Sequence, residues 1–184
     1  MVNTDFMKYT YMHRKAFEFT VMKMIKNPET RRLLLLRARK HDLDKQMLYT
    51  LIGKKESSAW HHANSSHHME NDIQKNYYDM VEAVIDYECA GYTKPDKSRN
   101  AYDTVIELKP AHSDELMQII RQLGAAEHYR NTPQDEDWIK YCQTIPEPTD
   151  ENMMDEIYWY ITAYPGYATR VYQYATEVKN SARA

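Results

Sequence analysis

Residues 5–26 read DFMKYTYMHRKAFEFTVMKMIK, and their apolar positions recur with the spacing of an α-helix. The apolar stripe consists of Phe6, Tyr9, Met12, Ala16, Phe19, Met22 and Ile25. Thr4 or Asp5 is a suitable N-terminal cap for this helix. Asn27-Pro28 ends it, because proline disfavours helical geometry in the residue before it. The stretch therefore predicts a long first helix that carries His13 beside its apolar stripe.

Further helices are predicted along the rest of the chain from apolar spacing and from capping residues. Their expected ranges are Glu29 to about Lys40, Asp44 to Ile52 with a stop at Gly53, His67 to Ala90 with a stop at Gly91, Ser113 to Leu123 with a stop at Gly124, Thr132 to Gln143, Thr149 to Tyr164, and a last helix after Pro165-Gly166 to Lys179. A short helical segment carries Trp60, with Ser57 or Ser58 as its cap. Asn64-Ser65-Ser66 reads as a break and a new cap.

Two segments between these helices differ in character. Residues 94–100 are polar and contain Pro95, which predicts an exposed loop. Thr104 to Leu108 is rich in β-branched residues and reads as a short extended piece, but one strand makes no sheet. The expected class is all-α, with seven or eight helices. We expect a single helical domain over residues 1–184, with a core up to residue 95 and a helical extension over 96–184.

Composition excludes several classes of protein. Glycine and proline number only 4 and 7 in 184 residues, which favours long helices with few tight turns. The net charge of −3 gives no support for a general nucleic-acid binder. The two cysteines, Cys89 and Cys142, form no disulfide framework, so a cytoplasmic protein is expected. The longest aliphatic run, Leu33 to Leu36, is too short for a membrane span, and the first residues lack the pattern of a leader.

Histidine is concentrated in one part of the chain. Five of the eight histidines fall between residues 41 and 68, at His41, His61, His62, His67 and His68. Imidazole is the commonest protein ligand for transition metals, and His41-Asp42 adds an anionic oxygen next to a nitrogen. The cluster predicts a metal site. Its alternative is a surface patch that binds metal adventitiously, and His112 and His128 lie outside it as structural or exposed residues.

Two further residues are candidates because of their helices. His13 lies in the first predicted helix, beside the apolar stripe. Asp86 lies within a largely apolar helical face, where a buried carboxylate is costly unless it is paired or metal-bound. A helix-surface position is the alternative for Asp86. The candidates thus follow the order His13, His41-Asp42, the histidines of 61–68, and Asp86.

This order resembles the HD-domain superfamily of metal-dependent hydrolases. The resemblance covers about residues 5–90 and implies an HD-like helical bundle with His13, His41, Asp42 and Asp86 as core metal ligands. His41-Asp42-Leu43-Asp44-Lys45 matches the family's His-Asp-x-x-Lys form, which implies that Lys45 faces substrate phosphate or the attacking water. The segment WHHANSSHHME, residues 60–70, is also similar to an uncharacterised HD-like family.

The histidines of residues 61–68 match the extra ligands of HD proteins that bind two metals. If one helix ran straight through, His61 and His68 would share a face. If Ser65-Ser66 breaks the helix, His62 can converge with His67 or His68, and we favour the break. The expected ligands are His13, His41, Asp42, His62, His67, His68 and Asp86. Glu70 is either a residue that holds a ligating imidazole or a surface residue.

The resemblance implies hydrolysis of a phosphoester in a nucleotide or a similar small phosphorylated metabolite. One or two divalent transition-metal ions (Fe, Mn, Zn, Co or Ni) would activate water, with Asp42 and Lys45 as the catalytic residues. One alternative is a mixed-valent diiron oxygenase of the HD type. Another is a non-catalytic helical binding protein with a structural metal. The tyrosine-rich C-terminal half predicts helix packing or an interface between copies in a homo-oligomer.

Overall fold

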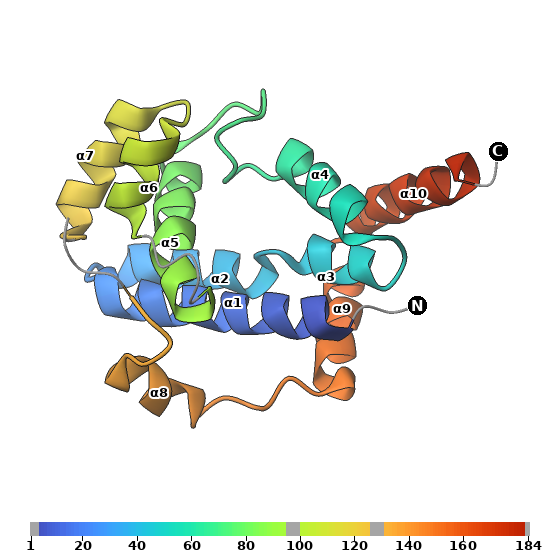
Figure 1. Cartoon of the computed structure of the whole chain (residues 1–184), viewed down its shortest axis with the longest axis horizontal. Coiled ribbons are helices and arrows are strands. Elements are labelled where there is room, and N and C mark those ends of the chain that lie inside the picture. Colours follow the sequence, from blue (N-terminus) through green and yellow to red (C-terminus); the bar gives the residue numbers. More distant parts are fainter. Residues whose placement is uncertain (1–3, 95–99, 126–130, 183–184) are drawn as a thin grey trace. The chain divides into compact units, whose positions relative to one another are not determined.

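The computed structural model describes residues 4–94, 100–125 and 131–182, and these residues form ten α-helices and no strand. The helices are α1 (Thr4–Met24), α2 (Pro28–Lys40), α3 (Leu43–Tyr49), α4 (Lys54–Asn64), α5 (Tyr77–Thr93), α6 (Ala101–Leu108), α7 (Ser113–Leu123), α8 (Glu136–Cys142), α9 (Asp150–Ala163) and α10 (Pro165–Ser181) (Figure 1). The all-α prediction is confirmed. Within the described residues, no helix is both long and apolar enough to cross a lipid bilayer.

The chain divides into two compact units that alternate along the sequence. The first unit comprises Met1–Met12, Lys40–His62 and Glu147–Ala184, and the second comprises His13–Arg39 and Ala63–Pro146. The first of the four sequence boundaries between them falls inside α1, after Met12. The C-terminal residues from 147 onward thus share a unit with residues 40–62. The expectation of a single domain divided at residue 95 stays a prediction.

The first unit is built around a core of α3, α9 and α10 with the start of α1. Its buried hydrophobic cluster consists of Met7, Tyr11, Leu43, Met47, Leu48, Tyr49, Trp60, Met153, Ile157, Tyr160, Ala168, Val171 and Ala175. Gln46 of α3 is fully buried and donates to the carbonyl oxygen of Met153 at 2.8 Å, which ties α3 to α9. This core fixes α3, the helix that directly follows His41-Asp42.

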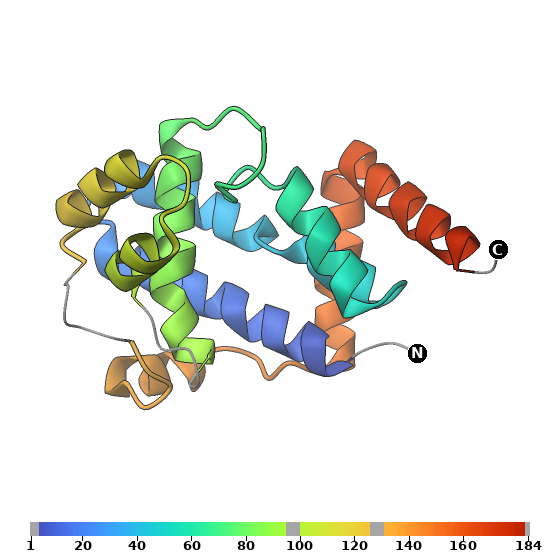
Figure 2. The same cartoon turned by 45° about the horizontal axis from the view of Figure 1, so that its top comes forward.

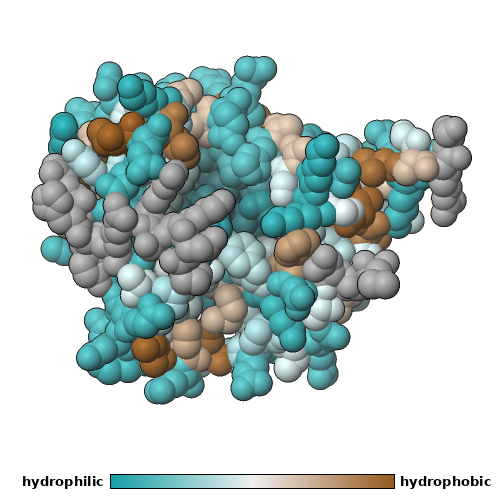
Figure 3. All heavy atoms as spheres, viewed as in Figure 1, coloured by the Kyte–Doolittle hydropathy of each residue, from teal (hydrophilic) through white to brown (hydrophobic). Residues whose placement is uncertain are grey.

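Tyrosines hold α4 and α10 together in the first unit. The Trp60 ring packs edge-on against Tyr167 at 5.4 Å between centroids, and Tyr174 donates to the carbonyl oxygen of Glu56 at 3.2 Å. The helix-packing interpretation of these tyrosines is confirmed. Tyr158 and Tyr172 are instead exposed, and hydrophobic residues are visible along α10 between hydrophilic ones (Figure 3). The predicted homo-oligomer stays a prediction.

The second unit packs α6 and α7 against α5 (Figure 2). The buried side chain of Glu88 links α5 to two other segments. Its Oε2 accepts from the backbone N–H of Ala101 at 2.8 Å, and its Oε1 accepts from the side chain of Asn131 at 3.0 Å. Phe19 of α1 contacts the rings of Tyr92, Trp138 and Tyr141, so α1, α5 and α8 share one aromatic cluster.

The predicted helix from His67 to Ala90 is wrong in its first half, because α5 begins only at Tyr77. Asn76 caps α5 by accepting from the N–H of Asp79, whose carboxylate accepts from the N–H of Asn76 in return. Upstream, the Asn71 side chain accepts from the N–H of Ile73, and Lys75 donates to the carbonyl oxygen of His68. Side-chain bonds to the backbone therefore hold residues 65–76 out of a helix.

Other helix boundaries also differ from the predictions. Residues 101–108 form α6 rather than an extended piece, because Asn100 caps the helix by accepting from the N–H of Asp103 at 2.7 Å. Ser57 lies inside α4 rather than at its cap, and Gly53 precedes α4 instead of closing α3. The predicted break after Asn64 is confirmed. His128 and most of the predicted loop at 94–100 lie outside the described residues.

Candidate metal centre

The turn His41-Asp42 connects α2 to α3, and Asp42 adopts an unusual backbone conformation there. Its φ of 59° and ψ of 10° lie in the left-handed region, which aspartate tolerates better than most residues at a cost of about 1 kcal/mol. Asp42 occupies the N-cap position of α3, but its side chain makes no capping hydrogen bond. The carboxylate therefore serves other groups.

Those groups form a buried cluster within the first unit. Asp42 Oδ2 accepts from Lys45 Nζ at 2.8 Å, and Asp42 Oδ1 lies 2.9 Å from His61 Nε2. On the other side of the ring, His61 Nδ1 lies 2.7 Å from Asp44 Oδ2. His41 Nε2 is 3.8 Å from Asp42 Oδ1. Asp44, His61 and Asp42 thus form a carboxylate–imidazole–carboxylate chain, with Lys45 and His41 at the Asp42 end.

The charges of this cluster are coupled. Burial by itself raises the pKa of Asp42, but the charges of Lys45, His41 and His61 outweigh it and hold that pKa well below its usual range. Burial lowers the pKa of His61, but the Asp44 and Asp42 carboxylates raise it above the ordinary value of histidine. Both nitrogens of His61 face carboxylate oxygens and both donate only in the imidazolium form. The cluster thus holds an ionised Asp42 in a buried position.

His61 and His62 are neighbours in α4, but one side chain is buried and the other is exposed. The His61 side chain is 1% exposed, whereas His62, the next residue of α4, is exposed. The sequence predicts His62 as the ligand, and this stays a prediction. The structure gives His61 the buried role, as the link between Asp42 and Asp44.

The second unit contains its own group of candidate ligands, where α1 meets α5. His13 Nε2 lies 2.7 Å from Asp86 Oδ1, and the other ring nitrogen lies 3.4 Å from Thr93 Oγ1 and 3.9 Å from Cys89 Sγ. One ligand atom each from His13, Asp86 and Cys89 lies within 4.8 Å of the other two. His13 and Asp86, two of the predicted ligands, are therefore in direct contact.

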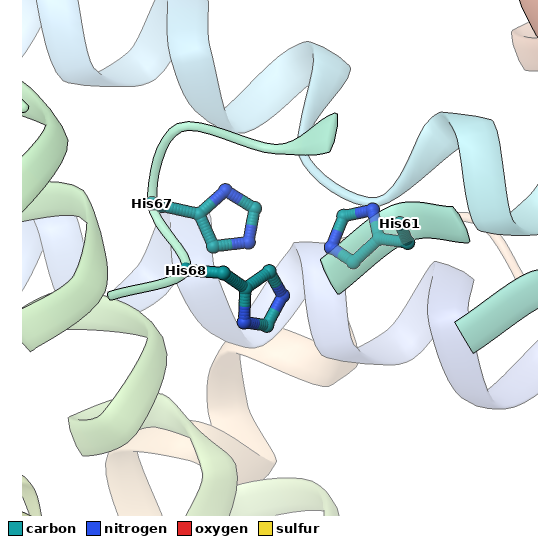
Figure 4. Close-up of side chains that lie close together, drawn as sticks. All are labelled: His61, His67 and His68. Carbon is teal, nitrogen blue, oxygen red and sulfur yellow. The ribbon is translucent and has the colours of Figure 1, made fainter. Parts of the chain in front are cut away.

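His67 and His68 lie on the irregular segment after α4, with ring centroids 4.5 Å apart (Figure 4, which also shows His61 on α4). His67 is buried and its Nδ1 lies 3.5 Å from Glu82 Oε1. Glu82 in turn accepts from Arg37 at 2.9 Å. His68 Nδ1 lies 3.3 Å from Glu70, whose side chain is 54% exposed. A carboxylate oxygen thus lies near the Nδ1 atom of each imidazole.

The donor set fits a divalent transition metal. Imidazole nitrogens with carboxylate oxygens suit Zn, Fe, Co, Ni or Mn, and an added thiol suits Zn. Buried groups of histidine and acidic residues in the described part of the chain could hold such an ion. The HD resemblance takes His41 and Asp42 from the first unit and His13 and Asp86 from the second. The metal and the number of ions stay predictions.

Sequence reasoning gave no role to four residues of these clusters. Asp44 appears only within the His41–Lys45 motif, and the sequence patterns assign no metal-binding role to Cys89, Glu82 or Arg37. One signal was available for Cys89, which follows Asp86 by three residues and so shares its face of a helix. No sequence signal pairs Arg37 with Glu82 across 45 residues.

Comparisons with known proteins add no relative: no family model, no curated protein and no solved structure matches this chain.

Replacing Asp79 by asparagine is expected to flatten the dependence of stability on acid. Burial alone would raise the pKa of Asp79, but hydrogen bonds from Arg37, Asn76 and Ser66 lower it below the ordinary value. A lowered pKa stabilises the fold above the unfolded-state pKa of about 3.9, and this stability is lost as the pH falls through the folded-state value. We expect Asp79→Asn to cost about 1–2 kcal/mol at pH 7 and progressively less below pH 4, measured by urea unfolding. Asp72→Asn, at an exposed position, is the control; equal acid sensitivity of Asp79→Asn and wild type would contradict the assignment.

Proposed function

We propose that this protein is a metal-dependent phosphohydrolase of the HD type, which hydrolyses a phosphoester of a nucleotide or a similar small phosphorylated metabolite. One observation carries the proposal: His41, Asp42 and Lys45 lie together at a turn of the first unit where Asp42 has a left-handed backbone. Strained backbone and buried charge are costly, and both concentrate at functional sites.

The residues of this turn have distinct parts in the proposal. Asp42 and His41 offer an anionic oxygen and a nitrogen to the ion. A bound divalent ion lowers the pKa of a coordinated water, so that hydroxide is available near neutral pH. Asp42 also orients that water. Lys45, whose side chain is 17% exposed, keeps an ammonium group beside Asp42, where it can stabilise charge that develops on phosphoryl oxygens.

The second unit supplies the remaining residues of the proposal. His13 and Asp86 are proposed as core ligands on the HD resemblance. His62, His67 and His68 are proposed as the additional ligands if a second ion binds. Glu82 supports the assignment of His67, because a carboxylate on Nδ1 leaves Nε2 as the ligating atom. The nucleotide part of the proposal comes from the resemblance alone.

Lys45 favours phosphate chemistry over the oxygenase alternative. An ammonium group at the ligand set attracts an anionic substrate, whereas dioxygen carries no charge. We expect Lys45→Gln to retain bound metal while kcat/KM for phosphoester hydrolysis falls about 10²-fold or more. Steady-state kinetics with parallel metal analysis measures both quantities. Unchanged kinetics in this variant would remove Lys45 from the mechanism.

The central test is metal content by mass spectrometry on untagged protein purified without chelators. Wild type is expected to hold one or two equivalents of a transition metal and to hydrolyse nucleotides or p-nitrophenyl phosphate. The double variant His41→Ala/Asp42→Ala is expected to lose both properties. The matched control is His112→Asn, an exposed position with a φ of 61° that asparagine tolerates.

Three results would reject the proposal. Wild type that holds no more metal than the double variant, even after divalent ions are added back, rejects the metal site. Bound metal without hydrolysis of any phosphoester rejects the reaction. Bound iron with oxygen uptake and a mixed-valent signal would instead establish the oxygenase alternative.

A further inference from the structure

Cys89 is a buried thiol that the HD resemblance does not use. It is 0% exposed, carries no disulfide, and lies on α5 one turn after Asp86. Its Sγ lies 3.9 Å from His13 Nδ1 and 3.3 Å from the carbonyl oxygen of Asp86. The thiol thus lies beside the His13 ring on its Nδ1 side, whereas Asp86 contacts Nε2 of the same ring.

The spacing of the three side chains is that of a ligand set. One ligand atom from each lies within 4.8 Å of the other two. Metal–nitrogen and metal–oxygen bonds of about 2.0–2.2 Å and metal–sulfur bonds of about 2.3 Å separate ligand atoms in a tetrahedral site by roughly 3.3–3.8 Å. Asp86 faces Nε2 of His13 and Cys89 faces Nδ1, so the side chains have to rotate before one ring nitrogen can share an ion with both partners. The Asp86 side chain is 18% exposed, which leaves a route for the ion from solvent.

We propose that Cys89 is an additional protein ligand beside His13 and Asp86, and that this site therefore takes Zn²⁺ or a similarly thiophilic divalent ion. The proposal rests on the proposed function in that His13 and Asp86 are metal ligands there. It goes further because a thiolate selects zinc or cobalt over magnesium and manganese. On binding, the Cys89 S–H bond breaks, sulfur bonds to the ion, and the proton passes to solvent.

The second cysteine provides the matched control. Cys142 ends α8 and is only partly buried, and it is not a member of any ligand group found among the described residues. A ligand role and an ordinary buried role for Cys89 predict different results, because only a ligand changes the electronic spectrum of the metal. Co²⁺ is the probe, since cobalt bound to a thiolate gives a sulfur-to-metal charge-transfer band in the near ultraviolet.

The experiment is titration of the full chain with Co²⁺, followed by absorbance and by metal analysis after desalting. Wild type and Cys142→Ser are expected to bind Co²⁺ and show the band. Cys89→Ser and Cys89→Ala are expected to lose the band and to bind Co²⁺ at least about tenfold more weakly. Circular dichroism on each variant establishes that the loss is not a loss of folding, and the alanine variant serves if serine unfolds the core.

The failures of the two proposals are distinguishable. Bound Co²⁺ without the band in wild type, or the same band in folded Cys89→Ser, overturns the role of Cys89 and leaves the phosphohydrolase proposal standing. If wild type binds no Co²⁺, the role of Cys89 is overturned as well. In that case, metal retention and phosphoester hydrolysis compared between wild type and His41→Ala/Asp42→Ala decide the proposed function separately.

Discussion

Replacing Gly91 by alanine is expected to destabilise the second unit by about 2–3 kcal/mol. A Cβ atom at Gly91 would lie 2.1 Å from the backbone carbonyl oxygen of Asn131, and backbone cannot move aside as a side-chain tip can. Asn131 is also held in place, because its side chain donates to the carbonyl oxygen of Glu88 at 2.8 Å. Alanine favours a helix over glycine by about 1 kcal/mol, which is too little to offset the clash.

Urea unfolding followed by tryptophan fluorescence is the measurement, since Trp138 contacts Tyr92, the neighbour of Gly91. Gly166→Ala is the matched control: it also lies in a helix, but a Cβ there meets nothing within 4 Å. That control is expected to be neutral or slightly stabilising. If Gly91→Ala were as stable as Gly166→Ala, the close approach of α5 to Asn131 would be refuted.

Gly91 illustrates what the sequence does and does not predict. The apolar spacing of residues 6–25 predicts α1 almost to its end, and Gly124 closes α7 as expected, with a positive φ of 69°. The same reasoning assigned Gly91 to a helix end, whereas it lies inside α5 and allows a distant backbone to approach. A helix-stop signal and a packing signal look alike in sequence.

The missed helix boundaries have a local cause. Asn76 and Asn100 begin α5 and α6 through side-chain caps, and each is a residue type that sequence rules favour at a cap. Apolar spacing from Ile73 onward and the β-branched run at 104–106 outweighed those signals in the prediction. Tertiary contacts support the observed starts: Glu88 accepts from the first N–H of α6.

The candidate site could be predicted by residue type but not by geometry. The order of residues along the sequence predicts His13, Asp86 and His41-Asp42 as metal ligands. The structure shows His13 in contact with Asp86. The choice between His61 and His62 depends on which face of α4 is buried, and the polar composition of residues 54–64 does not reveal that face. Asp44 and His61 are 17 residues apart in the sequence, and only the fold brings their side chains into contact.

Replacing His61 by alanine is expected to destabilise the first unit by about 3–5 kcal/mol. The imidazole lies between two buried carboxylates, 2.9 Å from Asp42 and 2.7 Å from Asp44. Its removal takes away the cation that lowers the pKa of Asp44 against the opposite effect of burial, so a buried carboxylate loses its main compensation. It also leaves a space the size of an imidazole in the interior, which adds a cavity cost.

His62→Ala is the matched control, because it removes the same side chain from the next, exposed position of α4. Urea unfolding without added metal, followed by the fluorescence of Trp60, is expected to show a change within about 0.5 kcal/mol for His62→Ala. His61→Gln tests the cause, since an amide can donate to one carboxylate but carries no charge; it is expected to recover only part of the lost stability. Equal stability of the two alanine variants would mean that the Asp44–His61–Asp42 chain does not stabilise the fold. A full recovery with glutamine would show that hydrogen bonding, rather than charge, is what the buried carboxylates require.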